Sequence, residues 1–228
     1  MPTTLAPPRK RIGRILATLD RAYPDAACSL QFTNPLELLV ATILSAQCTD
    51  VLVNKVTPAL FKNYKTAKAY AAADLGQLER EVSRVNFYRN KAKSIKLACT
   101  AIVERFGGKV PNRMEDLVTL HGVARKTANV VLGNAFKMQA GVVVDTHVMR
   151  LSQRMGLTAQ TDRDKIEQDL MRLVPQERWT LFGHQMIQHG RRICKAPAPL
   201  CAQCPLGPSL CPSHRAEGPR QKRPVVRA

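Results

Sequence analysis

Residues 114–136, MEDLVTLHGVARKTANVVLGNAF, predict two helices joined by a tight turn. Gly122 supplies a turn conformation that a side chain would hinder. The turn leads directly into the N-terminus of the second helix, whose unpaired N–H groups and positive dipole end suit a phosphate group. Contacts of that kind bind a nucleic-acid backbone without reading its sequence. The segment therefore predicts a helix–turn–helix unit with a phosphate-binding turn.

The charge of the chain points to the same class of partner. Its 228 residues include 35 Lys and Arg against 17 Asp and Glu, which gives a formal net charge of +18. A surface this basic attracts polyanions, and nucleic acid is the most common of them. An anionic membrane surface is the weaker interpretation, because no basic amphipathic stretch stands apart from the folded pattern. We see no signal peptide and no apolar run of membrane-spanning length, so we expect an intracellular protein.

Helical patterns account for most of the sequence. Residues 34–47 have Asn34 as an expected N-cap and Pro35 at the first helical position, followed by apolar residues at helical spacing. Residues 87–108 form a longer amphipathic pattern that ends at a glycine pair. No run alternates with period two for long enough to suggest a sheet. The predicted class is all-α, with roughly ten helices and short connections.

Seven cysteines in an intracellular protein argue for metal or redox chemistry rather than disulfides. Three are scattered in apolar segments and are interpreted as small buried hydrophobes: Cys28, Cys48 and Cys99. The other four lie in a proline-rich loop: Cys194, Cys201, Cys204 and Cys211. Their thiolates can converge on one soft metal centre. Zinc sites usually have two close ligand pairs, whereas only the middle pair is close here, so an iron–sulfur cluster is favoured over zinc without being decided by spacing alone.

Two residues could carry chemistry. Lys126 falls in the first turn of the second helix of the opening segment, where the helix end and Arg125 disfavour a protonated amine. An uncharged amine can attack a carbon and form an imine; a simple phosphate contact is the alternative, and physical chemistry alone favours the latter. Asp145 closes an apolar run and opens a helix, so it can be an N-cap, a proton-transfer group or both.

Together these motifs resemble the endonuclease III family of DNA glycosylases, from about residue 30 to residue 211. The resemblance implies an all-α, two-lobed helix-hairpin-helix fold with a C-terminal iron–sulfur cluster loop. Residues 28–140 would form a six-helix domain that carries the hairpin. Residues 1–27 and 141–228 would form the cluster domain, with a disordered basic tail from about residue 213. That tail is either a phosphate-binding arm or a solubilising segment.

The resemblance also implies base excision repair by a bifunctional DNA glycosylase and AP lyase. Lys126 would displace an oxidised pyrimidine from its sugar, form a Schiff base and cut the strand by β-elimination, with Asp145 assisting proton transfer. The cofactor would be a [4Fe–4S] cluster on the four loop cysteines. The partner would be double-stranded DNA with damaged bases or abasic sites, bound by a cytoplasmic, nucleoid-associated monomer.

Eight residues are expected at the DNA: Gln47, Phe87, His121, Gly122, Val123, Ala124, Arg125 and Thr127. In the family pattern Gln47 helps to fill the space left by a flipped base, and Phe87 is the apolar wedge beside it. The alternatives are a polar residue at a helix end for Gln47 and a core aromatic for Phe87.

The chain departs from the family pattern at four places. His121 stands where proline is usual, Ala124 where glycine is usual, and Asn86 where glycine is common before the wedge. The last cysteine spacing, between Cys204 and Cys211, is six residues, where five is commoner. These departures keep open a catalytically weak or non-catalytic DNA-binding paralogue. An adenine glycosylase is disfavoured, because no acidic residue occurs between Glu37 and Asp50.

Overall fold

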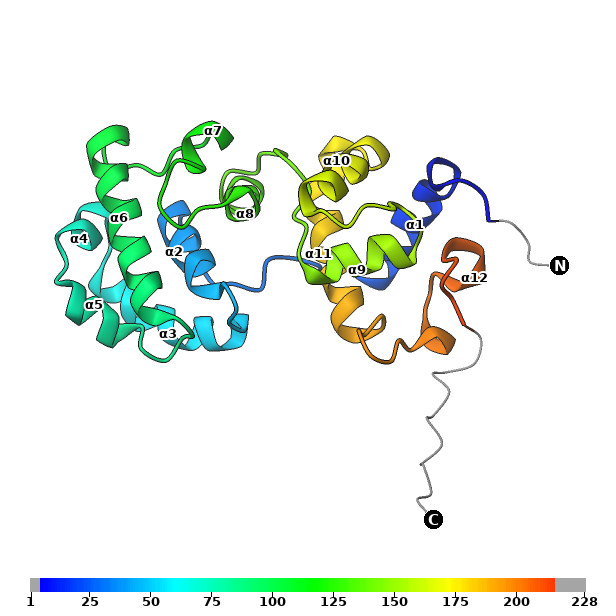
Figure 1. Cartoon of the computed structure of the whole chain (residues 1–228), viewed down its shortest axis with the longest axis horizontal. Coiled ribbons are helices and arrows are strands. Elements are labelled where there is room, and N and C mark those ends of the chain that lie inside the picture. Colours follow the sequence, from blue (N-terminus) through cyan, green and yellow to red (C-terminus); the bar gives the residue numbers. More distant parts are fainter. Residues whose placement is uncertain (1–4, 216–228) are drawn as a thin grey trace, which may run out of the picture. The chain divides into compact units, whose positions relative to one another are not determined.

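The computed structural model describes residues 5–215, and within that range it contains only helices (Figure 1). The predicted all-α class is therefore confirmed. The chain divides into two compact units: residues 28–140, here called the continuous unit, and residues 1–27 with 141–228, here called the split unit. Most of the predicted basic tail lies outside the described residues. Between residues 5 and 215, no helix has the length and apolar character needed to cross a membrane.

The continuous unit contains seven α-helices, one more than the six expected. Its helices are α2 (Pro35–Ser45), α3 (Asp50–Asn63), α4 (Ala67–Ala72), α5 (Leu75–Glu81), α6 (Tyr88–Phe106), α7 (Met114–Leu117) and α8 (Arg125–Ala135). Helix α7, the first helix of the predicted hairpin, is a single turn. Asn34 caps α2 as predicted, since its side chain accepts a hydrogen bond of 3.0 Å from the Glu37 N–H.

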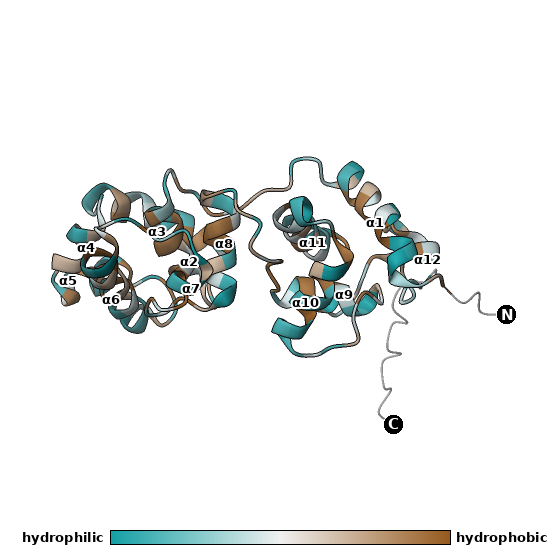
Figure 2. Ribbon diagram, turned by 90° about the horizontal axis from the view of Figure 1, so that it is seen from above, coloured by the Kyte–Doolittle hydropathy of each residue, from teal (hydrophilic) through white to brown (hydrophobic). Residues whose placement is uncertain are grey.

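Helix α2 forms the centre of the continuous unit. Its sequence is apolar on nearly every side, which is typical of a buried helix. It packs against α3, α6 and α8, while α6 also packs against α4 and α5. Figure 2 shows apolar segments on α3 and α8 of this unit. Leu38, Leu39 and Leu44 are almost fully buried, so the core fixes the helices from which the hairpin and its neighbouring loops project.

The split unit is assembled from the two ends of the chain. Its helices are α1 (Pro8–Ala22), α9 (Thr146–Arg154), α10 (Arg163–Leu173), α11 (Trp179–Arg192) and α12 (Gly207–Leu210), with short 3₁₀ helices at Gln176–Arg178 and Cys201–Gln203. Helix α11 packs against both α1 and α9, around Ile15, Phe182 and Met186. The segment after Cys194, interpreted from the sequence as a proline-rich loop, contains α12 and a 3₁₀ turn, because Leu206 and Leu210 are buried in this core.

Arg11 joins the two ends of the chain within the split unit. Its side chain is only 4% exposed, and its guanidinium donates to the backbone oxygens of Ala6 (2.6 Å), Met155 (3.0 Å) and Leu210. A guanidinium carries five N–H donors, so one side chain can satisfy several buried carbonyl groups. Helix α1 is thereby fastened to the end of α9 and to α12.

The burial prediction for the three scattered cysteines is correct in one case. Cys99, on α6, is 1% exposed and belongs to the core of the continuous unit. Cys28 and Cys48 are only half-buried, because each lies in a connecting segment at the edge of that core.

Candidate active site and cluster pocket

The turn between α7 and α8 needs glycine for two separate reasons. Gly122 has a φ of +77°, in the left-handed region that glycine adopts most readily. A Cβ at this position would also lie 2.8 Å from Cβ of Ser94 on α6. His121, which replaces the usual proline, has its Nδ1 3.1 Å from the Oγ of the same serine. The turn is therefore held against α6 by a hydrogen bond rather than by a proline ring.

The N-terminus of α8 presents the candidate nucleophile. Ala124 occupies the N-cap position and offers no side-chain hydrogen bond, so this helix end has no side-chain cap. Lys126 is the second residue of the helix and is exposed, as are Ala124 and Arg125. An uncapped helix end of this kind is suited to a phosphate group. Basic side chains in its first turn add to the attraction for an anion.

Two of the predicted hairpin residues are more buried than the others. Val123 is 5% exposed and belongs to the core of the continuous unit, and its N–H donates to the Leu120 oxygen at 3.1 Å. Thr127 is half-buried. The exposed part of the turn therefore consists of His121, Gly122 and the start of α8.

Asp145 caps α9, as its position in the sequence predicted. Its Oδ1 accepts hydrogen bonds from the N–H groups of His147 and Val148, both at 2.8 Å. The side chain is half-buried at the end of a buried run of valines. Because one carboxylate oxygen receives both hydrogen bonds, the backbone fixes the orientation of the group.

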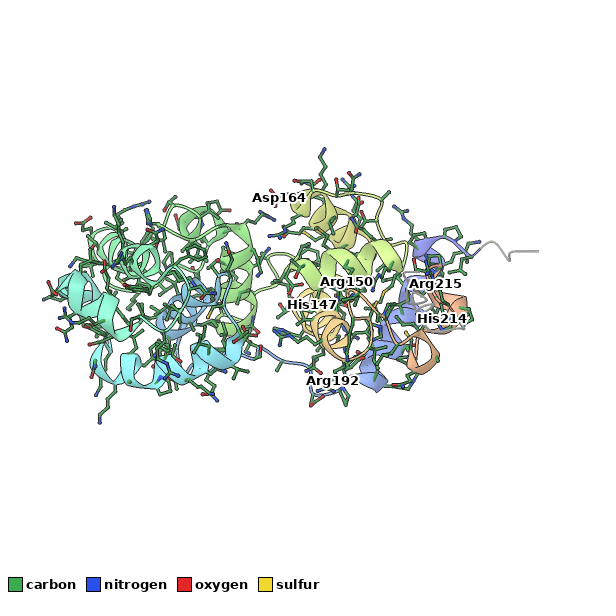
Figure 3. All side chains as sticks on the ribbon, turned by 60° about the horizontal axis from the view of Figure 1, so that its bottom comes forward. His147, Arg150, Asp164, Arg192, His214 and Arg215 are labelled. Atoms are coloured by element: carbon green, nitrogen blue, oxygen red, sulfur yellow. The ribbon has the colours of Figure 1, made fainter. Side chains whose placement is uncertain are left out.

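His147 and Arg150, labelled in Figure 3, were not assigned a role from the sequence. Arg150 Nη2 lies 3.2 Å from His147 Nδ1 and donates to the oxygens of Gly190 (3.3 Å) and Cys194 (2.8 Å). Burial lowers the pKa of His147, so its uncharged ring can accept from the arginine. The spacing of three residues on a helix was the available signal for this pair.

Gln47 and Phe87 lie in two loops of the continuous unit. Both residues have left-handed backbones, with φ of 52° and 56°. Gln47 is exposed, and Phe87 is 60% exposed, so the interpretation of Phe87 as a core aromatic is wrong. It directly precedes α6 and occupies the N-cap position of that helix.

The four loop cysteines surround one pocket in the split unit. The pocket has a volume of about 340 Å³, and Cys194, Cys201, Cys204 and Cys211 all line it. Two sulfurs have polar neighbours that could hydrogen-bond to ligand thiolates: Arg154 Nη1 is 3.3 Å from Cys194 Sγ, and His189 Nε2 is 3.6 Å from Cys204 Sγ. Burial raises the pKa of Cys211 to about 11, so its thiolate form needs a cation beside it.

The donor set of the pocket is four cysteine thiols. Iron–sulfur clusters are held by four thiolates, and zinc also accepts four of them. By their chemistry these residues therefore fit an iron–sulfur cluster.

Comparisons with known proteins agree with this geometry. Residues 40–176 match the model of the HhH-GPD superfamily of base excision DNA repair proteins. The chain is 56% identical to endonuclease III of Synechocystis over 93% of its length and 96% of that protein. It is 45% identical to endonuclease III of Bacillus subtilis, over 96% and 98% of the two chains.

Solved structures give the same result. A structure described as a trapped endonuclease III–DNA covalent intermediate is 43% identical, with a TM-score of 0.85 over 90% of this chain and 96% of that chain. A thermostable thymine-DNA glycosylase, 19% identical with a TM-score of 0.82, shares the fold. The chain belongs to the endonuclease III family, within the HhH-GPD superfamily of base excision DNA repair proteins. It is a base excision repair enzyme of the DNA glycosylase and AP lyase class.

Proposed function

We propose that this enzyme removes oxidised pyrimidines from double-stranded DNA and then cuts the strand at the abasic site, with Lys126 as its nucleophile. The observation that carries the proposal is the exposed position of Lys126 in the first turn of an uncapped helix, directly after the Gly122 turn. The covalent DNA intermediate of the 43% identical endonuclease III supports a mechanism through a covalent bond.

In the proposed mechanism, the Lys126 Nζ bonds to C1′ of the sugar while the bond from C1′ to the base breaks, and the electron pair leaves with the base. Loss of the amine protons and opening of the sugar ring give an imine. Removal of a C2′ proton then expels the 3′ phosphate by β-elimination. Asp145, whose carboxylate is oriented by two backbone N–H groups, assists these proton transfers.

The hairpin and the basic side chains would bind the DNA backbone. His121, Gly122, Ala124 and Arg125 would contact phosphates around the hairpin, and the net charge of +18 would strengthen binding at low salt. Arg150, Arg192 and Arg215, labelled in Figure 3, belong to the split unit and add to its positive charge. We place the enzyme, as a monomer, at the nucleoid in the cytoplasm.

The proposed cofactor is a [4Fe–4S] cluster bound by Cys194, Cys201, Cys204 and Cys211. When bound, it supplies folding free energy to a loop that buries few apolar side chains. We assign it no step in base removal or strand cleavage.

Borohydride trapping on a duplex with an abasic site tests the role of Lys126. Wild type should form a covalent adduct and Lys126→Ala should form none, while both bind the duplex with similar affinity. Lys109→Ala, which removes another exposed lysine of the same unit, should behave like wild type. Failure of the wild type to form an adduct despite tight binding would contradict the proposal, and the protein would then be a monofunctional glycosylase or a DNA-binding protein.

Asp145→Asn separates the catalytic role from the capping role. Asparagine is also a good N-cap, so α9 should keep its start. We expect turnover to fall by about 10²- to 10⁴-fold with little change in DNA affinity, because only the proton-transfer group is lost. Unfolding of the variant, with proportionate loss of binding, would show that the cap is the main role.

A further inference from the structure

The loops that carry Gln47 and Phe87 are joined to each other. Asn86 Nδ2 donates to the backbone oxygen of Gln47 at 2.9 Å, across a separation of 39 residues. One turn into α6, Lys91 Nζ donates to the backbone oxygen of Leu44 at 2.8 Å. The segment 86–91 is therefore fastened to the C-terminal end of α2 and the loop after it by two hydrogen bonds.

These two hydrogen bonds lie in different environments. Lys91 is 6% exposed, and its hydrogen bond lies inside the continuous unit, where it serves the fold. Asn86 is exposed, and its hydrogen bond connects two loops at the surface. Replacing Asn86 should therefore change the arrangement of the loops without disturbing the core.

Both loops hold an unusual backbone. A left-handed conformation is unfavourable for residues with a Cβ, yet Gln47 and Phe87 both adopt it. Such conformations persist where the surroundings hold them in place, and they are frequent at functional sites. Asn86 immediately precedes one of these residues and hydrogen-bonds to the other. It is thus placed to keep the two side chains in one fixed arrangement.

We propose that Asn86 is a positioning residue that pre-arranges Gln47 and Phe87 for entry into the base stack. The proposal rests on the proposed function, since it assigns these two residues to the DNA duplex. Pre-arrangement lowers the ordering cost when the side chains enter DNA. This lower cost should speed the extrusion of a damaged base that is still stacked and paired in the duplex. An abasic site presents no base to extrude, so its cleavage should not depend on Asn86.

The test compares two substrates with one enzyme variant. Asn86→Ala should process a duplex with 5-hydroxycytosine paired to guanine about 3- to 10-fold more slowly than wild type, the effect of losing roughly one hydrogen bond. On the same duplex with an abasic site, the two enzymes should cleave at equal rates. A 2-aminopurine beside the 5-hydroxycytosine should report slower unstacking in the variant.

Two further variants separate positioning from a general loss of structure. Asn63→Ala removes another exposed amide of the same unit, one that hydrogen-bonds to Glu81 instead of to either loop, and it should match wild type on both duplexes. Adding Asn86→Ala to the double variant Gln47→Ala/Phe87→Ala should cause no further slowing, because Asn86 acts through those two side chains.

Each outcome has one meaning. Slow processing of 5-hydroxycytosine with unchanged abasic-site cleavage supports the proposal. Equal slowing on both duplexes, or none on either, overturns it. A wild type that shows no borohydride adduct instead refutes the function on which the proposal rests, and is recognised before any variant is compared.

Discussion

The two units of this protein are stabilised in different ways. The continuous unit is one stretch of 113 residues, Cys28–Ala140, and its helices surround the apolar helix α2. The split unit combines both chain ends, and its cysteine loop buries few apolar side chains beyond Leu206 and Leu210. In the split unit, a buried arginine and a pocket lined by four cysteines add to the apolar core around Phe182 and Met186. Segments that are far apart in the sequence are thus joined by directed hydrogen bonds as well as by apolar packing.

Loss of a pocket cysteine should produce the largest difference in stability between the two units. In Cys204→Ser the proposed cluster and its visible absorption should be absent, because one of its four ligands is removed. Since metal binding supplies folding free energy, we expect the segment 194–211 to lose at least about 3 kcal/mol of local stability. Hydrogen exchange should show fast exchange in that segment and unchanged protection in α2 and α6.

Cys48→Ala is the matched control for this comparison, since Cys48 lies in the other unit and away from the pocket. It should keep the visible absorption. Equal loss of protection in both units of Cys204→Ser would show that the cluster stabilises the whole chain rather than one unit.

Replacement of Arg11 should have the next largest effect. Arg11→Met keeps the length of the side chain but leaves the buried oxygens of Met155 and Leu210 without their donor. We expect a loss of about 2 to 4 kcal/mol in the unfolding of the split unit, measured by urea titration, because buried acceptors left unpaired are costly.

Lys91→Met makes the equivalent change in the continuous unit, where one donor to the Leu44 oxygen is lost. Its cost should be smaller, about 1 to 3 kcal/mol, because one acceptor is affected instead of several. A larger loss in Lys91→Met than in Arg11→Met would contradict the view that the split unit depends more on polar bonds.

The smallest expected effect is on the pH dependence of the stability of the continuous unit. Burial raises the pKa of Cys99 to about 12 from an ordinary value of 9.0. Between these values the folded state holds a proton that the unfolded state has lost, so stability should fall as pH rises, by up to about 1.4 kcal/mol per pH unit. Urea unfolding from pH 8 to 10.5 should show a shallower decline in Cys99→Ala. An identical slope in both proteins would mean that water reaches this thiol.

Much of the fold could be predicted from local sequence signals. Asn34 and Asp145 are side-chain caps whose donors lie two or three residues away, and Gly122 encodes its own turn conformation. These interactions depend on short-range spacing, which a sequence displays directly. The all-α class followed from the same periodicity.

Contacts between distant residues could not be predicted in this way. The hydrogen bond from Asn86 to Gln47 spans 39 residues, and the contact between His121 and Ser94 spans 27. Nothing in the local pattern indicates which polar side chain will meet which loop. The sequence left Phe87 open between an exposed wedge and a core aromatic for the same reason, because the helical periodicity after it says nothing about the residue before the helix.

The long sequence separation between Arg11 and its acceptors also affects how the protein folds during its synthesis. Its acceptors at Met155 and Leu210 lie 144 and 199 residues further along the sequence. A ribosome adds about 5 to 20 residues per second, so α1 waits roughly 10 to 40 s for its last partner to be translated. During that time the whole stretch from Cys28 to Ala140 emerges and can fold. Helix α1 is thus made before the continuous unit but reaches its last partner only after that unit has emerged.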